Sequence, residues 1–243
     1  MEFSGTIALV TGGAHRLGRA IAMELAAGGA DIALHYGRSA EAAEQTAADI
    51  HQATGRRVEL FQCDLREPAE IEAMFAQLAT TLGRLDVLVN NAGAYRPTPI
   101  DTLTAEQWDG LFAINARAPA LCIRHASALM QDGGAIVSIT DIAAARGFAG
   151  YPAYCASKAA LEGLTRSTAK ALAPRGIRVN AVAPGIAEWS SDDSEAARKT
   201  VLAQVPMKRP GTPQDIAAAV AFLAAADYIT GQVLRVDGGW HMG

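Results

Sequence analysis

The segment TIALVTGGAHRLGRAIAMELAAG, residues 6–28, joins a short apolar run to a helical stretch through a glycine-rich turn. Thr6–Val10 has the apolar, β-branched character of a buried strand, and the residues after Gly18 place apolar side chains at helical spacing. Glycines in the turn allow a ligand close to the backbone, and the amino end of the following helix favours a phosphate group. The segment therefore predicts the first strand, turn and helix of an α/β sheet.

The rest of the chain repeats this alternation of short apolar runs and longer Ala, Glu and Leu-rich stretches. Nearly continuous apolar strands indicate helices on both faces of a sheet, and the long crossovers indicate parallel pairing. We predict the α/β class, with residues 1–243 forming a single Rossmann-type, doubly wound domain around a seven-stranded parallel sheet. The predicted strands are Thr6–Val10, Asp31–Tyr36, Val58–Gln62, Leu85–Asn90, Ala135–Ile139, Arg178–Val182 and Val233–Val236.

Composition favours one domain that binds small molecules. The chain has 243 residues, of which 50% are hydrophobic and 19% charged, enough to bury one large core. Its net charge of −4 provides no basic field for nucleic acid or an anionic membrane. The three cysteines lack a CxxC pair or a cysteine/histidine cluster, and no run has the length of a membrane span. We expect a cytoplasmic protein without metal, nucleic-acid or membrane partners.

One polar break interrupts the alternation. The stretch EWSSDDSE, residues 188–195, follows Pro184-Gly185 after the sixth predicted strand. A long polar segment inside a compact domain is typical of a functional loop. We predict a substrate lid loop around residues 186–204.

The end of the second predicted strand, HYGRS at residues 35–39, indicates which dinucleotide binds. NAD enzymes usually carry a carboxylate here for the ribose hydroxyl, and this stretch has none. Arg38 and Ser39 offer donors that suit a 2′-phosphate, so NADPH is favoured over NADH. The alternative is that Arg38 is a solvated residue and Ser39 a helix cap.

Tyr154 and Lys158 stand one helical turn apart and form a candidate catalytic pair. Holding a tyrosinate at pH 7 costs about 4 kcal/mol, and a lysine ammonium about 5 Å away returns about 3 kcal/mol. Lys158 is therefore expected to stabilise the ionised phenol. Such a phenol can give a proton to the atom that becomes electron-rich as hydride arrives.

The motifs TGGAHRLG, NNAG, YCASK and APG, together with Asn115, resemble in order and spacing the short-chain dehydrogenase/reductase family. The resemblance implies a proton relay of Asn115, Tyr154 and Lys158, with Pro184-Gly185 beside the nicotinamide. It also implies a homotetramer built through the helices around Ala116–Met130 and Tyr154–Leu172. Together with the strand-end arguments, it predicts NADPH contacts from Thr11, Gly12, His15, Arg16, Leu17, Gly18, His35, Tyr36, Arg38, Ser39, Asp64, Leu65, Asn91, Ala92, Gly93, Thr140, Tyr154, Lys158, Pro184, Gly185 and Ile186.

Two residues depart from the common family pattern. Asp141 stands thirteen positions before Tyr154, where most members have serine, and Arg16 replaces the middle glycine of the first motif. An ionised Asp141 would raise the phenol's pKa and oppose Lys158, so the two acids should titrate together and hold a transferable proton.

These departures, with HYGRS and the stretch YRPTP at residues 95–99, resemble the pteridine reductases. That resemblance implies a pterin or folate substrate bound by Arg16, Tyr95, Asp141, Tyr154 and Trp189. Some pteridine reductases have serine where this chain has Gly93, so a side-chain contact to the substrate or a phosphate would be missing here. We expect hydride transfer to a C=N bond of a dihydropterin or dihydrofolate, with the proton from Tyr154 and Asp141.

Two other functions fit the same scaffold. One is an NADPH-dependent carbonyl reductase such as a 3-oxoacyl-thioester reductase, and the other is an NADPH-binding protein without catalytic activity. Asp141 argues against the first, and the intact set of Asn115, Tyr154 and Lys158 argues against the second.

Overall fold

A seven-stranded parallel sheet forms the centre of the structure, a computed structural model that describes residues 2–131, 133–189 and 194–242. The strand order is β3-β2-β1-β4-β5-β6-β7, with all neighbours parallel. The order reverses between β1 and β4, the switch point at which open α/β sheets bind ligands. The strands are β1 (Ile7–Val10), β2 (Asp31–Tyr36), β3 (Val58–Gln62), β4 (Val87–Asn90), β5 (Gly134–Ile139), β6 (Ile177–Pro184) and β7 (Val233–Val236).

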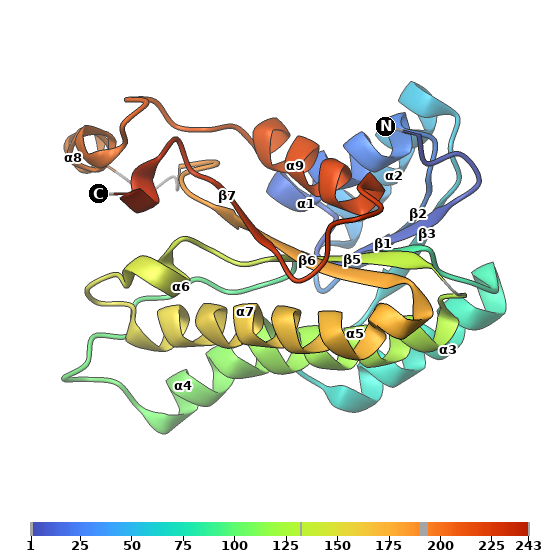
Figure 1. The fold of residues 1–243 in the computed structure, drawn as a ribbon, viewed down its shortest axis with the longest axis horizontal. Coiled ribbons are helices and arrows are strands. Elements are labelled where there is room, and N and C mark those ends of the chain that lie inside the picture. The colour runs from blue at the N-terminus through green and yellow to red at the C-terminus, as the bar shows by residue number, and fades with distance from the viewer. Residues whose placement is uncertain (1, 132, 190–193, 243) are drawn as a thin grey trace.

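Helices cover both faces of the sheet (Figure 1). Helices α1, α2 and α9 lie on one face, and α3, α4, α5 and α7 on the other. The predicted fold class, with its doubly wound parallel sheet, is confirmed. The helices are α1 (Arg16–Ala27), α2 (Ala40–Thr54), α3 (Pro68–Leu82), α4 (Ala105–Phe112), α5 (Ala118–Leu129), α6 (Ala143–Arg146), α7 (Pro152–Leu172), α8 (Glu195–Gln204) and α9 (Pro213–Ala225).

Alternating strand residues supply two apolar layers. Val10 packs in the layer under α1 and α9, whereas its neighbour Leu9 packs in the layer over α3 and α5. Both side chains are fully buried. This period of two explains why the strands are almost continuously apolar: each residue meets one covered face.

Four predicted strands have different bounds in the structure. Strand β1 starts one residue late, because the Thr6 amide and hydroxyl both turn back to the Phe3 carbonyl. Strand β4 starts two residues late, at Val87, because the amide of Leu85 bonds to Leu129 of α5. Strand β5 starts one residue early. Strand β6 is longer at both ends, because Ile177 pairs with Gly134 of β5 and its last residues pair with β7.

The predicted lid segment is partly helical. Helix α8 occupies Glu195–Gln204, and the hydroxyl of Ser194 caps it by accepting from the amide of Ala197 at 3.2 Å. The expectation of a loop throughout residues 186–204 is therefore wrong for its second half, and residues 190–193 lie outside the described residues. Serine before the helix was the signal that the polar composition concealed. Its role as a lid stays a prediction.

None of the helices in the described parts of the chain has the combined length and apolar character of a membrane span.

Close packing around the glycine-rich turn leads to a stability prediction. A Cβ on Gly18 would lie 2.0 Å from the Gly12 carbonyl oxygen and 2.6 Å from Asn91 Nδ2. We expect Gly18→Ala to lower the free energy of unfolding by about 3 kcal/mol, because backbone has to move. Gly110→Ala is the control, since a Cβ there meets nothing within 4 Å and alanine favours helix α4 by up to about 1 kcal/mol. Equal denaturant midpoints for the two variants would contradict the packing argument.

Candidate active site

The turn between β1 and α1 is held by side chains from β4. Asn91 Nδ2 donates to the carbonyl oxygens of Thr11 at 2.9 Å and Gly12 at 3.1 Å. The hydroxyl of Thr11 accepts from the amides of Asn91 and Ala92. Thr11 and Asn91 therefore shape the turn through hydrogen bonds within the protein.

His35 holds the same turn from β2. Its Nδ1 accepts from the Gly12 amide at 3.0 Å, and its Nε2 lies 3.1 Å from the Cys63 carbonyl oxygen. Burial lowers the pKa of His35, which favours the neutral ring with its proton on Nε2. The His35 ring therefore links the carboxyl ends of β1, β2 and β3. It also lines the neighbouring cavity.

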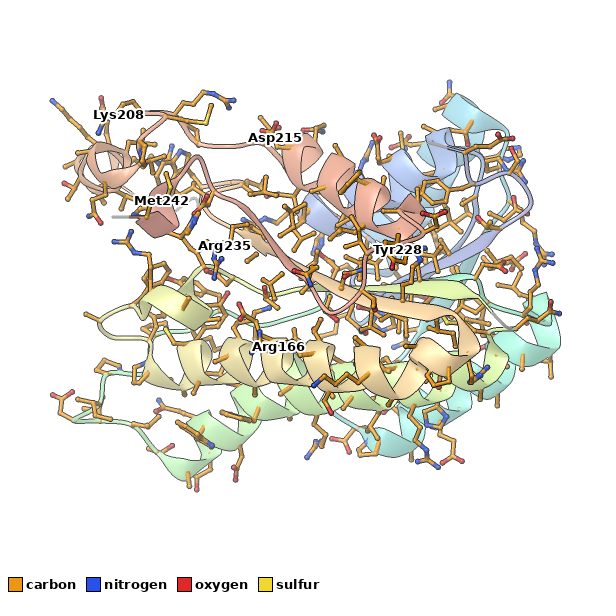
Figure 2. The ribbon with its side chains drawn as sticks, viewed as in Figure 1. Arg166, Lys208, Asp215, Tyr228, Arg235 and Met242 are labelled. Atoms are coloured by element: carbon orange, nitrogen blue, oxygen red, sulfur yellow. The ribbon has the colours of Figure 1, made fainter. Side chains whose placement is uncertain are left out.

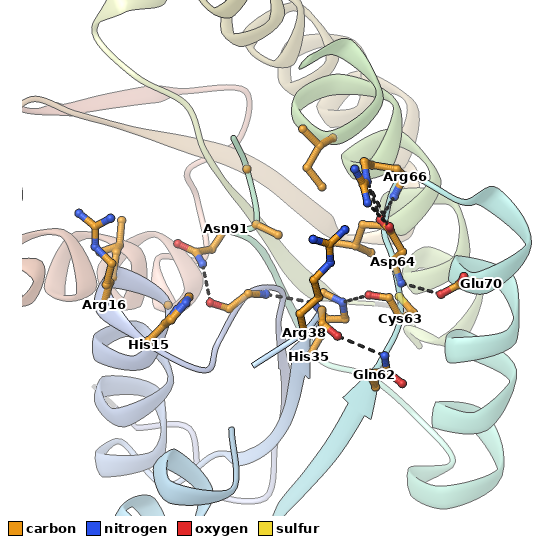
Figure 3. A pocket seen from close by; sticks show the side chains of 18 residues that line it. His15, Arg16, His35, Arg38, Gln62, Cys63, Asp64, Arg66, Glu70 and Asn91 are labelled. Carbon is orange, nitrogen blue, oxygen red and sulfur yellow. Dashed lines mark hydrogen bonds and ion pairs between the residues drawn. The ribbon is translucent and has the colours of Figure 1, made fainter. Parts of the chain in front are cut away.

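A cavity of about 570 Å³ lies over these strand ends (Figure 3). Gly12 has φ +63, and a Cβ on Gly18 would strike the turn, so the cavity floor consists of bare backbone. Helix α1 begins beside it without a capping side-chain bond, which leaves amides of its first turn available to an anion. The predicted cofactor residues that line the cavity are Gly12, His15, Arg16, Leu17, Gly18, His35, Arg38, Asp64, Leu65, Asn91, Ala92 and Gly93.

Two basic residues, Arg38 and Arg66, line the cavity. Arg38 is exposed and has no ion-pair partner among the described residues, while Arg66 forms an ion pair with Asp64. Hydrogen bonding from Arg66 holds the pKa of Asp64 at about 2. Ser39 occupies the position before α2 but makes no capping bond. The fit to a phosphate-bearing dinucleotide is good, because glycine backbone, a helix terminus and guanidinium groups meet at one cavity.

Sequence reasoning missed several residues in this region. Gln62, Cys63, Arg66, Glu70 and Ile114 also line the cavity. The first three flank the predicted third strand and its Asp64-Leu65 end, so the rule that ligands meet carboxyl ends of strands would have found them. Ile114 comes from a π-helical turn after α4 and carried no sequence signal.

Tyr154 and Asp141 form a direct hydrogen bond. The phenol donates to Asp141 Oδ2 at 2.6 Å, and Asp141 Oδ1 accepts from the Ala143 amide at 2.8 Å. Burial raises the pKa of Tyr154 well above its usual 10, and the Asp141 carboxyl raises it further. Burial also raises the pKa of Asp141, outweighing the bond from Tyr154. Both groups therefore keep their protons to a higher pH than an exposed tyrosine or aspartate would.

Lys158 lies behind the pair. Its Nζ donates to the Ile139 carbonyl oxygen at 2.8 Å and lies 5.8 Å from the centre of the Tyr154 ring. Burial lowers the pKa of Lys158 to about 8. In this structure burial and the Asp141 carboxyl favour the neutral phenol, and the stabilisation of a tyrosinate by Lys158 stays a prediction.

Asn115 fixes the loop after β4. It lies in the π-helical turn Ala113–Arg117, its Oδ1 accepts from the Ala94 amide, and its Nδ2 donates to the Ala94 carbonyl and to Ser157. A Cβ on Gly93 would lie 2.9 Å from Asn115 Oδ1 and 3.5 Å from Lys158 Nζ. A side chain at position 93 would therefore require Asn115 to shift.

The predicted substrate residues Tyr95, Trp189 and Arg16 lie around this region. Tyr95 stacks on Tyr151 with centroids 4.5 Å apart and meets the edge of Tyr154 at 4.7 Å. Trp189 packs under the Arg198 guanidinium at 5.5 Å. Arg16, with φ +52, forms an exposed 2.8 Å ion pair with Glu188 rather than turning toward Tyr95.

The remaining predicted cofactor residues lie at strand ends outside the cavity lining. Thr140 donates from its amide and hydroxyl to the Val182 carbonyl, and the Gly185 amide donates to Val236. A Cβ on Gly185 would lie 2.8 Å from Asp237 Cβ. Tyr36, Pro184 and Ile186 are likewise at the carboxyl ends of β2 and β6. No group of three potential metal ligands occurs in the described parts of the chain.

Comparison with known proteins identifies the family. A family model described as Enoyl-(Acyl carrier protein) reductase matches residues 12–241. The 3-oxoacyl-[acyl-carrier-protein] reductase FabG of Staphylococcus aureus strain MW2 is 39% identical over 241 residues, covering 97% of this chain and 98% of that protein. A short-chain dehydrogenase/reductase from Serratia marcescens BCRC 10948 matches with a TM-score of 0.94 at 35% identity, covering 99% of this chain and 100% of that one. The chain belongs to the short-chain dehydrogenase/reductase family.

A second similar structure contains bound NADPH. A blue fluorescent protein from a metagenomic library, solved in complex with NADPH, is 40% identical with a TM-score of 0.93 and covers 99% of each chain.

The predicted pteridine reductase function is wrong. The curated relative is named a 3-oxoacyl-[acyl-carrier-protein] reductase, and the matching family description also names an acyl carrier protein. These findings support the carbonyl-reductase alternative.

The buried lysine makes stability depend on pH. Because the pKa of Lys158 falls from 10.5 to about 8 on folding, the unfolded chain holds more protons between these values, and the free energy of unfolding rises with pH there. We expect Lys158→Met to be more stable than the native chain at pH 7 by about 3 kcal/mol, with the difference vanishing above pH 10.5. Denaturant unfolding across this range measures it.

Lys170→Met is the matched control, because Lys170 is exposed on the same helix. A pH-independent difference for Lys158→Met, or a native chain that is the more stable at pH 7, would contradict the assignment.

Proposed function

We propose that this chain is an NADPH-dependent oxidoreductase that reduces the keto group of 3-oxoacyl thioesters. The observation that carries the proposal is the 2.6 Å hydrogen bond from Tyr154 to Asp141, with buried Lys158 behind it, at the ligand-binding edge of the sheet. A proton-holding phenol at this place suits reduction of a carbonyl. The 39% identity to the staphylococcal reductase supports the thioester class.

The cavity residues support NADPH as the cofactor. Gly12 and Gly18 would let the pyrophosphate approach the backbone at the start of α1, and Arg38 would bind the 2′-phosphate. When bound, the nicotinamide supplies hydride. The related NADPH complex, 40% identical over nearly the whole chain, supports the same choice.

Tyr154 would complete the reduction by donating its proton to the carbonyl oxygen as the carbon accepts hydride. Asp141 lies within hydrogen-bond distance of the phenol oxygen and would return a proton to it. A carboxyl group whose pKa is raised by burial stays neutral over a wider pH range, so it can donate a hydrogen bond as a hydroxyl does. This accounts physically for an acid where the family usually has serine.

The predicted homotetramer and cytoplasmic location stay predictions. For the tetramer, α7 exposes the small residues Ala159, Ala160, Gly163 and Ser167 along one side, which would allow another helix to approach closely. A monomeric mass in solution would contradict it.

The test of function is NADPH oxidation with an acetoacetyl thioester. We expect turnover by the native chain and a loss of at least about 100-fold in kcat for Tyr154→Phe, because the phenol proton is gone. Asp141→Ser should retain more activity than Asp141→Ala, since serine restores a donor. NADPH binding without turnover of any carbonyl compound would instead support the non-catalytic alternative.

The cofactor preference rests on Arg38. Arg38→Ala should reduce the ratio of kcat/KM for NADPH to that for NADH by about tenfold or more, because charged hydrogen bonds to a 2′-phosphate are lost. Arg57→Ala is the control, since Arg57 precedes β3 at the opposite edge of the sheet and pairs with Glu59. An unchanged ratio in Arg38→Ala would rule out this phosphate contact.

A further inference from the structure

The C-terminal turn packs behind the segment that carries Asp141. Figures 1 and 2 place the chain end and Met242 beside α8 and above α6. Trp240, 9% exposed, is buried in an apolar cluster with Ile142, Ala183 and Val205. We call this group, with the partly buried Phe148, Ile186, Val201 and Val233 that pack on it, the tail cluster.

Trp240 packs against both ends of the segment that contains α6, residues 142–148, which we call the α6 segment. Its ring stacks on Phe148 with centroids 5.5 Å apart, and the Arg146 guanidinium lies 5.4 Å above the ring. Arg146 also donates a hydrogen bond to the Trp240 carbonyl oxygen. Ile142, next to Asp141 in sequence, packs in the same cluster.

The α6 segment depends on such contacts. A four-residue helix cannot hold its own shape, because one turn fixes many dihedral angles for few hydrogen bonds. Yet this segment supplies the Ala143 amide that binds Asp141 Oδ1, and the Phe148 amide lies 3.2 Å from Cys155 Sγ, beside Tyr154. The contacts that Trp240 makes with Arg146 and Phe148 therefore support a segment that bonds to Asp141 and to the neighbour of Tyr154.

Hydrogen bonds within residues 237–241 hold the C-terminal turn in its conformation. Asp237 accepts from the amides of Gly239 at 3.0 Å and His241 at 2.7 Å, and it lies 2.8 Å from His241 Nδ1. Gly238 and Gly239 both have positive φ, which turns the chain back onto the cluster. Trp240 Nε1 also lies 3.5 Å from Gln204 Oε1 at the end of α8.

We propose that Trp240 is a positioning residue, which holds the α6 segment so that Asp141 keeps its hydrogen bond to Tyr154. The catalytic importance of this role rests on the proposed function, whereas the contacts of Trp240 with the α6 segment do not depend on it. Loss of the indole would free α6, lengthen the Asp141 to Tyr154 contact and admit water to the phenol. Tyr154 would then lose part of the burial and of the Asp141 interaction that raise its pKa.

The test follows the ionisation of Tyr154 directly. Tyrosine labelled with ¹³C at Cζ gives signals for the five tyrosines, and the Tyr154 signal is assigned by its loss in Tyr154→Phe. In the native chain the Tyr154 phenol should stay protonated, and its signal unshifted, at pH values where an ordinary phenol of pKa about 10 ionises. In Trp240→Ala it should ionise at lower pH, whereas Trp240→Phe and the exposed control Tyr228→Ala should behave as native.

Kinetics supply a second readout. We expect Trp240→Ala to lower kcat for the acetoacetyl thioester by about tenfold to a hundredfold, with the KM for NADPH within about twofold, because the donor pair rather than the cofactor site is displaced. Rescue by Trp240→Phe separates positioning from a specific chemical role of the indole.

The possible outcomes distinguish a failure of the positioning role from a failure of the proposed function. A native-like Tyr154 titration in Trp240→Ala overturns the proposal, whether or not any carbonyl compound is reduced. A shifted titration in a protein that reduces no carbonyl compound leaves the positioning role standing and refutes the proposed function. If Trp240→Ala does not fold, Arg146→Gln carries the test, and an unshifted Tyr154 in that variant overturns the proposal.

Discussion

A hydrogen bond between two buried acids, Tyr154 and Asp141, is the interaction on which the candidate active site depends. Tyr154 donates to Asp141 at 2.6 Å in surroundings that raise the pKa of both groups. Ionising either acid would place charge in a poorly solvated site, which opposes loss of its proton. In the proposed reaction the phenol would release its proton to a substrate oxygen that becomes basic. Lys158, whose own pKa is lowered by burial to about 8, moderates this balance without reversing it.

The sheet brings this pair to the cofactor cavity. Parallel strands share one ligand-binding edge, so Asp141 after β5 and Tyr154 at the start of α7 lie near the loop that follows β4. Asn115 ties that loop to Ser157, and Gly93 allows the close approach of Asn115 and Lys158. The same edge carries Gly12 and Arg38, so binding and proton transfer depend on one topology.

Much of this arrangement could be predicted from the sequence, because the strands are continuous apolar runs and glycine-rich turns follow them at fixed places. The spacing of Tyr154 and Lys158 predicted their common helix face. The direction of the electrostatic balance could not be predicted, since it depends on how deeply the phenol is buried. The same holds for the braces made by His35 and Asn115, which are bonds between segments distant in sequence.

Substrate class showed a different limit. Asp141, Arg16 and Tyr95 together suggested a pterin site, but in the structure Arg16 pairs with Glu188 and Tyr95 stacks on Tyr151. Local residue identity predicts which groups are available, whereas their partners decide what they do.

The most direct test of this account is the ionisation of Asp141 itself, followed by ¹³C NMR of its labelled carboxyl group and assigned with Asp141→Asn. The account predicts a midpoint above the ordinary 3.8 in the native chain and a further rise in Tyr154→Phe, because the hydrogen bond from Tyr154 lowers the pKa of Asp141. A midpoint at or below 3.8 in the native chain would mean that Asp141 is a permanent anion, and would contradict the proton-holding pair.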